Sequence, residues 1–229
     1  MVDPARRSVE RAPKQRRSRL REQRILDVAW TLFCAPGASE VSVREVCAAA
    51  ETSPSSFYAR FRDRGGLLET MIERFEAEFL RTIEDAIEFA QPDGDLPTFV
   101  HRLVSSTLEF TSRRAPLVGR VRRAAVDDAG VEERWKRFEL RAFAALEASL
   151  ERVRPGPEAT AIAERHRALS PAIEAIYRGV DGSAGAPSHD EGEAQARRMK
   201  IARDLTGWLL DGDPPSASAG TSQATTIGA

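Results

Sequence analysis

The residues best suited to bind a partner lie between Ser42 and Leu68. Ser53 and Pro54 predict the start of a very short helix, because serine is a preferred N-cap and proline at the first helical position loses no hydrogen bond. Phe57 and Phe61 are spaced at i and i+4 and are expected to face the core. The side chains left on or near the outward face are Pro54, Ser55, Ser56, Tyr58, Ala59 and Arg60. A helix that begins with small polar groups can approach base edges in the major groove, so the chemistry expected here is DNA recognition.

A second short helix precedes this one and must hold it in place. Ser42 and Glu45 predict a capping box at its start. One apolar face follows at i, i+3, i+4 and i+7, formed by Val43, Val46, Cys47 and Ala50. A break at Glu51-Thr52 separates the two helices. The pattern predicts a helix-turn-helix, although the spacing alone fits an ordinary helical hairpin equally well.

The residues around this pair favour the first interpretation. After Phe61, the run from Arg62 to Leu68 predicts the capped start of another helix and no strand pair that could form a wing. From about residue 20 to about residue 75 the chain resembles the DNA-binding domain of the TetR family of one-component repressors. The features that match in order are the apolar helix at 19–34, Gly37, Ser42-Val43, the Phe57-Tyr58-x-x-Phe61 step, Arg64 and Leu67-Leu68.

The resemblance implies roles for individual residues. It implies phosphate contacts by Tyr58 and Arg64. It also implies that four residues face the bases: Ser55, Ser56, Ala59 and Arg60. The complete set of DNA-binding candidates is Ser42, Arg44, Ser53, Pro54, Ser55, Ser56, Tyr58, Ala59, Arg60 and Arg64. In the family the remaining helices surround an effector pocket, and the last two pair with a second subunit as a four-helix bundle.

Several residues depart from the family pattern. Glu51 stands where the turn usually has glycine, so a positive φ there would carry a penalty. Gly65 and Gly66 weaken the first turn of the following helix. Ala38 replaces an aromatic residue, and Arg64 replaces the more usual lysine.

Composition indicates a globular protein with a basic N-terminal part. The chain has 229 residues, 41% hydrophobic and 30% charged, and can bury a real core. The net charge of −1 divides into +5 for residues 1–66 and −6 for the rest, which indicates a polyanionic partner for the first part. No run approaches a membrane span and the N-terminus is too polar for a signal peptide, so a cytoplasmic protein is expected. Cys34 and Cys47 are expected to be reduced core residues, with a redox pair as the weaker alternative.

The apolar period predicts an all-α fold. Residues 1–18 are expected to form a basic flexible arm that follows the phosphate backbone or enters a minor groove, unless they are only a solvated tail. Helices are expected at 19–34, 63–90, 96–113, 116–127, 130–153, 157–179 and 191–211, with a flexible loop at 181–192. The predicted domains are the arm, a three-helix DNA-binding domain at 19–66, a helical effector-binding and dimerisation domain at 67–211, and a disordered tail at 212–229.

Two sets of residues in the helical body are candidates for function. The effector-binding candidates combine aromatic and apolar residues with few polar ones: Phe75, Phe79, Leu103, Thr107, Phe110, Trp135, Phe138, Arg141 and His166. They suit a mainly hydrophobic or aromatic molecule, although the aromatics could equally be plain core. The dimerisation candidates form apolar stripes: Ile162, Leu169, Ile173, Met199, Ala202, Leu205, Trp208 and Leu209. An isolated helix with such a stripe buries it against a partner, although both stripes could also pack within one subunit.

The sequence argues against an enzyme. His101, His166 and His189 have no helical partner at i+4, and no CxxC, HExxH or phosphate-binding glycine loop is present. No metal and no cofactor are therefore expected. The expected partners are an operator in double-stranded DNA, a second copy of the chain and a small-molecule effector. The alternative is a helix-turn-helix protein, activator or architectural, that takes no small-molecule input.

Overall fold

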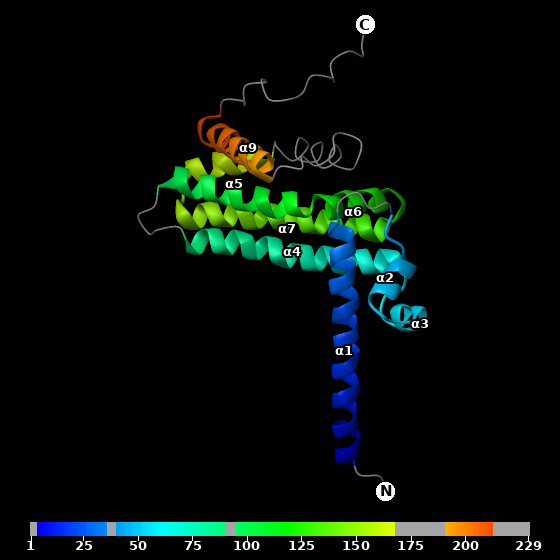
Figure 1. Cartoon of the computed structure of the whole chain (residues 1–229). Helices are drawn as coiled ribbons and strands as arrows, with labels where there is room; N and C mark the ends of the chain where they lie inside the picture. The colour runs from blue at the N-terminus through cyan, green and yellow to red at the C-terminus, as the bar shows by residue number, and fades with distance from the viewer. Residues whose placement is uncertain (1–3, 36–39, 90–94, 168–190, 213–229) are drawn as a thin grey trace. The chain divides into compact units, whose positions relative to one another are not determined.

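The computed structural model describes residues 4–35, 40–89, 95–167 and 191–212, and all regular structure in these ranges is helical (Figure 1). The all-α prediction is therefore confirmed for this part of the chain. None of the described helices is long and apolar enough to cross a membrane. The C-terminal tail, the loop at 181–190 and the end of the predicted 157–179 helix lie outside the described residues.

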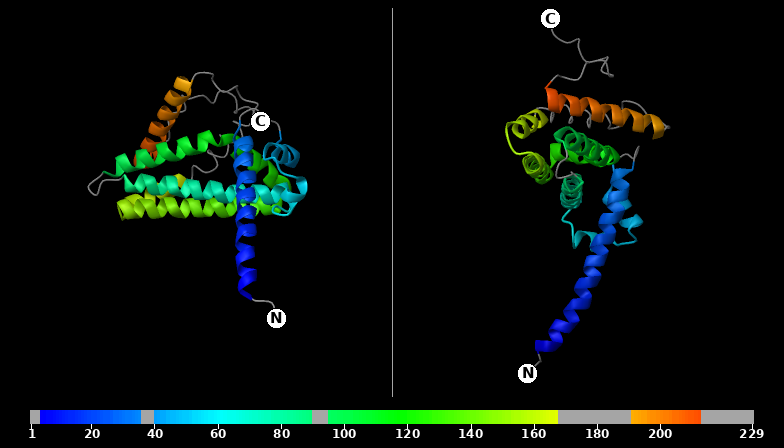
Figure 2. Two further views of the ribbon diagram at one scale, coloured as in Figure 1. Left: turned by 60° about the horizontal axis from the view of Figure 1, so that its bottom comes forward. Right: turned by 90° about the vertical axis from the view of Figure 1, so that its left-hand side faces the viewer.

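The helix α1 runs from Pro4 to Cys34. The prediction of an arm without regular structure is therefore wrong for residues 4–18. The sequence of this segment is rich in Arg, Lys, Gln, Glu and Ala, which lose little side-chain freedom in a helix, and Pro4 stands at its first position. In both views of Figure 2 the N-terminal half of α1 extends away from α2 and α3.

The other helices begin and end close to their predicted residues. They are α2 (Val43–Ala49), α3 (Pro54–Tyr58), α4 (Arg64–Glu88), α5 (Leu96–Arg113), α6 (Ala115–Asp127), α7 (Ala129–Val153) and α9 (Glu191–Asp211). Residues 157–167 are also helical. These boundaries could be predicted because caps and prolines act within one or two turns of the residues that carry them.

The chain divides into two compact units. Of the described residues, those within 4–79 and 112–142 belong to unit 1, and those within 80–111, 143–167 and 191–212 belong to unit 2. The helices α4, α5 and α7 contribute to both. Unit 1 thus groups the helix-turn-helix with the first part of α4, with α6 and with the first part of α7, whereas the predicted domains divide after residue 66.

The core of unit 1 joins the helix-turn-helix to the helices around it. The helix α1 packs against α2 and α6, and α2 packs against α3. The largest fully buried side chains here are Ile25, Phe33, Val46, Phe57, Leu67, Leu68, Met71, Ile72, Leu117 and Val118. Burial of side chains of this size contributes about 1.5–3 kcal/mol each before conformational entropy is subtracted, so this core holds the motif rigidly.

Unit 2 has its own core, drawn from α5, the second half of α7, the helix at 157–167 and α9. Its buried side chains include Phe99, Val100, Leu103, Phe110, Leu146, Leu150, Ile162 and Leu209. A polar contact joins α5 to α9, because His101 Nδ1 lies 3.2 Å from the hydroxyl of the buried Thr206. That hydroxyl already donates to Ala202 O at 2.7 Å, so His101 Nδ1 must be the donor.

Candidate nucleic-acid interface

The first helix of the motif is fixed by the capping box that the sequence predicts. The Ser42 hydroxyl accepts from Glu45 N at 3.2 Å, and Glu45 Oε2 accepts from Ser42 N at 2.8 Å. The Ser42 hydroxyl and the Ser42 N–H both donate to the Glu45 carboxylate, and these bonds lower the pKa of Glu45. Ser42 and Arg44 are both exposed, and Ser42 is already engaged in holding the helix.

The turn after α2 has the backbone geometry that ordinarily favours glycine. Glu51 has φ +49°, the one positive φ of a non-glycine residue among those described. Its N–H donates to Ala48 O and the Thr52 N–H donates to Cys47 O, which is the paired bonding of a Schellman C-cap. Glu51 therefore adopts the positive φ for which glycine is usually found in this turn, with the penalty that a side chain adds there. Arg24 lies 2.8 Å from the Glu51 carboxylate, but both side chains are mostly exposed and the ion pair contributes little.

The second helix presents the face that the sequence predicts. Ser53 is its N-cap and accepts from Ser56 N at 3.2 Å, with Pro54 in the first turn. Phe57 and Phe61 are buried against each other, with ring centroids 5.2 Å apart. The residues exposed around them are Ser53, Pro54, Ser55, Tyr58 and Ala59, while Ser56 is half-buried.

Arg60 lies differently from a residue aimed at bases. Its guanidinium donates to Ser56 O at 2.8 Å, to Ser18 Oγ at 3.0 Å and to Ser18 O at 3.3 Å. These bonds join the end of α3 to the middle of α1. Sequence reasoning missed Ser18, and no local pattern could have indicated a contact between residues 42 positions apart.

Arg64 also bonds to the protein itself. Its Nε donates to Val41 O at 3.1 Å, and its guanidinium carbon lies 5.9 Å from the centre of the Phe33 ring. Arg64 therefore joins the start of α4 to the segment before α2. Its role in phosphate contact stays a prediction.

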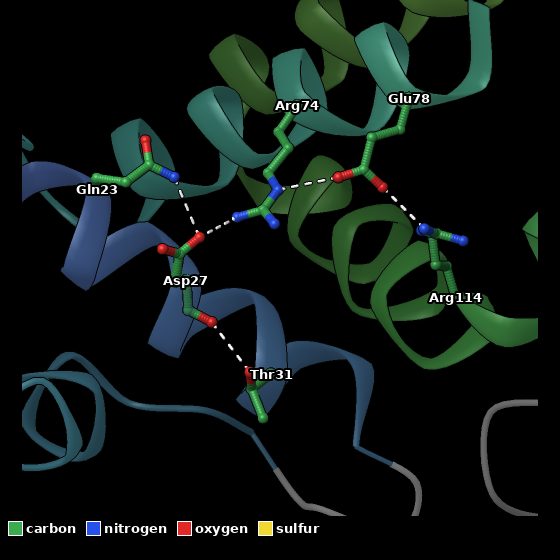
Figure 3. Close-up of polar contacts among 6 residues, drawn as sticks. All are labelled: Gln23, Asp27, Thr31, Arg74, Glu78 and Arg114. Carbon is green, nitrogen blue, oxygen red and sulfur yellow. Dashed lines mark hydrogen bonds and ion pairs between the residues drawn. The ribbon is translucent and has the colours of Figure 1, made fainter. Parts of the chain in front are cut away.

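A chain of charges fixes the C-terminal half of α1 (Figure 3). Asp27 of α1 pairs with Arg74 of α4 at 2.6 Å, Arg74 pairs with Glu78 at 3.0 Å, and Glu78 pairs at 2.8 Å with Arg114, the residue before α6. Both arginines also contact the Trp30 ring, with guanidinium carbons 4.6 Å (Arg74) and 5.6 Å (Arg114) from its centre. The helix α1 is thereby fixed to α4 and to α6.

Arg120 of α6 completes the fixation of α1. It is 4% exposed and donates to Phe33 O and to Ala35 O, the latter at 3.1 Å. These carbonyls lie in the last turn of α1 and just after it, where no intrahelical donor is available. Burial lowers the pKa of the Arg120 guanidinium. The motif is therefore positioned by arginines from α4 and α6 that sequence reasoning did not assign.

Four of the effector candidates form one aromatic cluster in unit 1. Phe75, Phe79, Trp135 and Phe138 are at most 7% exposed, with ring centroids 4.9–6.5 Å apart in the neighbouring pairs. The rings pack on one another, as core aromatics do. Arg141 is largely exposed and reaches the buried Glu76 at 2.8 Å.

Glu76 is the centre of a buried polar group in unit 1. Arg134 lies 2.7 Å from one of its oxygens and Arg141 lies 2.8 Å from the other. Burial raises the pKa of Glu76, but the hydrogen bonds from the two arginines outweigh it and leave the pKa below its usual value. Arg141 thus contacts a carboxylate of its own unit.

The other effector candidates belong to unit 2. Leu103 and Phe110 are buried, and the Thr107 hydroxyl donates to Leu103 O at 2.7 Å. The His166 ring meets the Phe143 ring edge-on at 5.5 Å, and burial lowers the pKa of His166 to about 4. A role for any of these residues in effector binding stays a prediction.

The dimerisation candidates differ in exposure. Ile162, Ala202 and Leu209 are buried within unit 2, Leu205 and Trp208 are half-buried, and Met199 is 56% exposed. Leu169 and Ile173 lie outside the described residues. Cys34 and Cys47 are free thiols, and burial raises the pKa of each.

Together the capped short helices, the turn and the helical body define a helix-turn-helix DNA-binding protein. Residues 25–71 match the family described as bacterial regulatory proteins, tetR family. No curated protein sequence matches the chain at a significant level. Residues 25–71 therefore carry a TetR-type DNA-binding domain, as the sequence pattern predicts.

Solved structures share the fold over most of the chain. A TetR-family regulator from Mesorhizobium loti has 13% identity and a TM-score of 0.64, with 86% of this chain and 98% of that chain covered. A tetR-family regulator from Streptomyces coelicolor has 17% identity and a TM-score of 0.58, with 82% and 79% covered. The fatty acid degradation regulator FadR from Bacillus halodurans has 12% identity and a TM-score of 0.59, with 84% and 99% covered. At such identities these likenesses concern the fold.

Proposed function

We propose that this regulator is a repressor without enzymatic activity. It binds a pseudo-palindromic operator as a homodimer and leaves the DNA when a small, mainly hydrophobic or aromatic effector binds. The observation that carries the proposal is the outward face of α3, which is small, polar and exposed on a helix capped at its start and buried through Phe57 and Phe61. Two such helices related by a two-fold axis would enter successive major grooves.

Contacts around α3 support the DNA-binding role. Tyr58 is 55% exposed and Arg44 is exposed, so both are available to phosphates. Arg60 bonds to Ser18 and Ser56, so reading a base would require it to exchange these hydrogen bonds for contacts with DNA. Its loss is therefore expected to loosen α1 from α3 as well as to change base preference.

The helical extension of α1 is suited to follow the phosphate backbone. Arg16, Arg19, Arg21 and Arg24 are all exposed on it. A helix holds these charges at fixed spacing, so they lose less conformational freedom on binding than charges on a flexible arm would. The proposal is that this helix adds sequence-independent, salt-sensitive affinity to the base contacts of α3.

Support for dimerisation and effector binding comes from the helical body. On α9, Leu205 and Trp208 are half-buried and Met199 is exposed, so part of an apolar stripe stays accessible to a second copy. Leu205 and Trp208 are proposed for the centre of that contact. The effector candidates add aromatic surface with few polar groups, which suits an apolar ligand.

One observation favours a second candidate, a DNA-binding regulator without small-molecule input. The rings of Phe75, Phe79, Trp135 and Phe138 lie against each other, so their apolar surface is satisfied without a ligand. Under this alternative the helical body serves only to dimerise the protein and to hold the motif.

Selection of DNA by the full-length protein tests the proposal. The protein would select duplexes from a random pool, and its affinity for the selected duplex and a scrambled one would be measured by fluorescence anisotropy. The proposal expects an inverted-repeat sequence with two protomers bound. Apolar compounds that raise the melting temperature should also release the DNA. Binding without sequence preference would contradict regulation at an operator, and stabilising compounds that leave DNA binding unchanged would favour the second candidate.

A further inference from the structure

The junction between α6 and α7 lies against the first turn of α4, the helix that follows the recognition helix α3. Asp128, alone between α6 and α7, ends the first helix and begins the second. Its N–H donates to Ala124 O at 3.0 Å, and its C=O accepts from Glu132 N at 3.0 Å. Its side-chain Oδ1 accepts from Gly130 N at 3.0 Å and from Val131 N at 3.2 Å. Asp128 is therefore the N-cap of α7, and its carboxylate is held in one orientation.

The other oxygen of the same carboxylate lies against α4. A methyl group on Gly65 would be 2.1 Å from Asp128 Oδ2 and 3.2 Å from Asp128 Cγ. Real side-chain atoms do not approach so closely, so only glycine at position 65 leaves room for this oxygen. Asp128 cannot turn away freely, because that would withdraw Oδ1 from the two N–H groups that it caps.

A second close approach lies one turn further along α4. A methyl group on Gly130 would be 2.8 Å from Glu69 Oε1, and Glu69 stands four residues after Gly65 on the same face of α4. The start of α4 contributes Gly65 and Glu69, and the start of α7 contributes Asp128 and Gly130, so each side supplies one glycine and one carboxylate. We refer to Gly65, Glu69, Asp128 and Gly130 as the α4–α7 joint.

The joint lies directly beside the residues that carry α3. Asp63 is the N-cap of α4, since its Oδ1 accepts from Gly66 N at 2.9 Å and its C=O accepts from Leu67 N. The buried Phe61, which packs on Phe57 of α3, is four residues before Gly65. A displacement of the first turn of α4 would therefore be passed to α3 through a short and well-packed segment.

We propose that Asp128 is a positioning residue for DNA recognition, which sets the placement of α4 and hence of α3 by filling the space left by Gly65. The inference rests on the proposed DNA-binding function. It assigns a purpose to Gly65, which by propensity alone only weakens the helix. It also makes the α6–α7 junction the place where a shift of these helices would change the fit of α3 to the major groove.

Two adjacent glycines provide a matched pair for the test. Gly65→Ala and Gly66→Ala give the same gain in helix propensity in the same turn. A methyl group on Gly66 would meet only Asp63 Oδ1 at 3.8 Å and Arg62 Cβ at 3.9 Å, which are ordinary contacts. The probe is a duplex selected by the wild-type protein from a random pool, with a scrambled duplex of the same composition beside it.

Gly65→Ala should weaken binding to the selected duplex about tenfold, because overpacking of this size shifts the backbone. It should also lower the ratio of selected to scrambled affinity, a quantity that uniform loss of folded protein would leave unchanged. Gly66→Ala should stay within about twofold of the wild type on both duplexes. Equal losses for the two variants, or an unchanged ratio for Gly65→Ala, would overturn the inference.

A compensating change keeps the test decisive if Gly65→Ala folds poorly. Asp128→Ser retains a capping oxygen but removes the oxygen nearest Gly65. The double variant Gly65→Ala/Asp128→Ser should regain stability and sequence preference relative to Gly65→Ala. If neither quantity recovers, the proposed role of Asp128 opposite Gly65 is contradicted. If the wild-type protein selects no duplex, the proposed function fails and this inference fails with it. If the wild type selects and all variants bind alike, the inference fails alone.

Discussion

Each of the two units uses an arginine from one helix to end another helix. In unit 1, Arg120 of α6 donates to Phe33 O and Ala35 O at the end of α1. In unit 2, Arg165 donates to Leu209 O at 2.7 Å and Leu210 O at 2.8 Å near the end of α9. Both arginines satisfy carbonyls of a last turn and place a cation at the negative end of a helix dipole.

The two caps differ in how deeply they are built into the protein. Arg120 is buried, and Arg74 and Arg114 add further contacts to the same end of α1 through Asp27 and Trp30. Arg165 is half-buried and lies against Gly212, the residue that follows α9. The helix supporting the DNA-binding motif is thus fixed by a buried arginine from α6 and further contacts from a second helix, whereas the end of α9 is fixed by part-buried contacts from one arginine. Changes in unit 1 should therefore cost more stability.

The largest effect is expected for Arg120→Met, which keeps the apolar volume and removes both donors. Two carbonyls in a buried region lose their partner, so the free energy of unfolding should fall by about 3 kcal/mol. Urea unfolding followed by circular dichroism measures this. Arg137→Met, at an exposed position of α7 in the same unit, is the control and should change stability by less than about 0.5 kcal/mol. Equal midpoints for the two variants would contradict the comparison.

On acidification, the titrating groups of the two units should lose their contributions to stability at different pH values. Burial lowers the pKa of His166 in unit 2 to about 4, below its unfolded value near 6.5. The unfolded chain then takes up the proton first, so the stability from the neutral ring is complete above pH 6.5 and is lost as pH falls towards 4. The loss should be about 2 kcal/mol after allowance for partial exposure.

Glu76 in unit 1 loses its contribution at lower pH. Its pKa lies below the usual 4.5, so its stabilisation is present above that value and disappears as pH falls through the lower folded pKa. Unfolding measured from pH 8 to pH 3 should show both slopes. His166→Gln should flatten only the upper window and Glu76→Gln only the lower one. A His166→Gln profile that matches the wild type between pH 6.5 and 4 would show that the ring is not buried in its neutral form.

A smaller effect is expected for Arg165→Met. The partly exposed carbonyls of Leu209 and Leu210 can bond to water instead, so the loss should be about 1 kcal/mol, well below that of Arg120→Met. Arg154→Met, a surface position in the same unit with a 3.9 Å ion pair, is the control and should be nearly neutral. If Arg165→Met lost as much stability as Arg120→Met, burial of the arginine would not explain the difference expected between them.

The parts of the fold that were predictable depend on local patterns. The capping box at Ser42, the start of α3 at Ser53-Pro54 and the buried faces through Phe57 and Phe61 are all encoded within one or two turns of chain. At Glu51 the family pattern only raises the question of a positive φ, and the structure answers it with φ +49°. Such features need no knowledge of distant partners.

The contacts that position the motif were not predictable. Arg120, Arg74 and Ser18 act on backbone carbonyls or side chains far away in the sequence, and a carbonyl acceptor leaves no mark on residue identity. The sequence does not predict the extended α1, because its basic residues have no apolar period and Pro13 opposes a helix there, although Arg, Lys, Gln, Glu and Ala favour one. The pair Gly65-Gly66 was recognised only as a weakness, because the carboxylate opposite it comes from residue 128.

The smallest effects are expected at two residues with a positive φ, one in each unit. Unit 1 has glutamate at Glu51 with φ +49°, whereas unit 2 has glycine at Gly212 with φ +83°. Glu51→Gly should stabilise the protein by about 0.5 kcal/mol, since relief of strain is partly offset by greater freedom of the unfolded chain. Gly212→Ala should destabilise by about 1 kcal/mol, because a methyl group there is strained and meets the Arg165 guanidinium at 3.1 Å. The melting temperature should rise for Glu51→Gly and fall for Gly212→Ala. A shift in the same direction for both variants would contradict this prediction.

The most direct test of the central claim compares one added charge in each unit. Ala59 is exposed at the end of α3 in unit 1, and Ala148 is exposed on α7 in unit 2. Binding of each variant to the selected duplex would be measured at one salt concentration, with melting temperatures alongside. Ala59→Glu should bind about a hundredfold more weakly, because its carboxylate faces phosphates and bases, while its melting temperature is unchanged. Ala148→Glu should bind as the wild type does. Equal binding by Ala59→Glu, Ala148→Glu and the wild type would contradict the assignment of α3 as the DNA-reading helix.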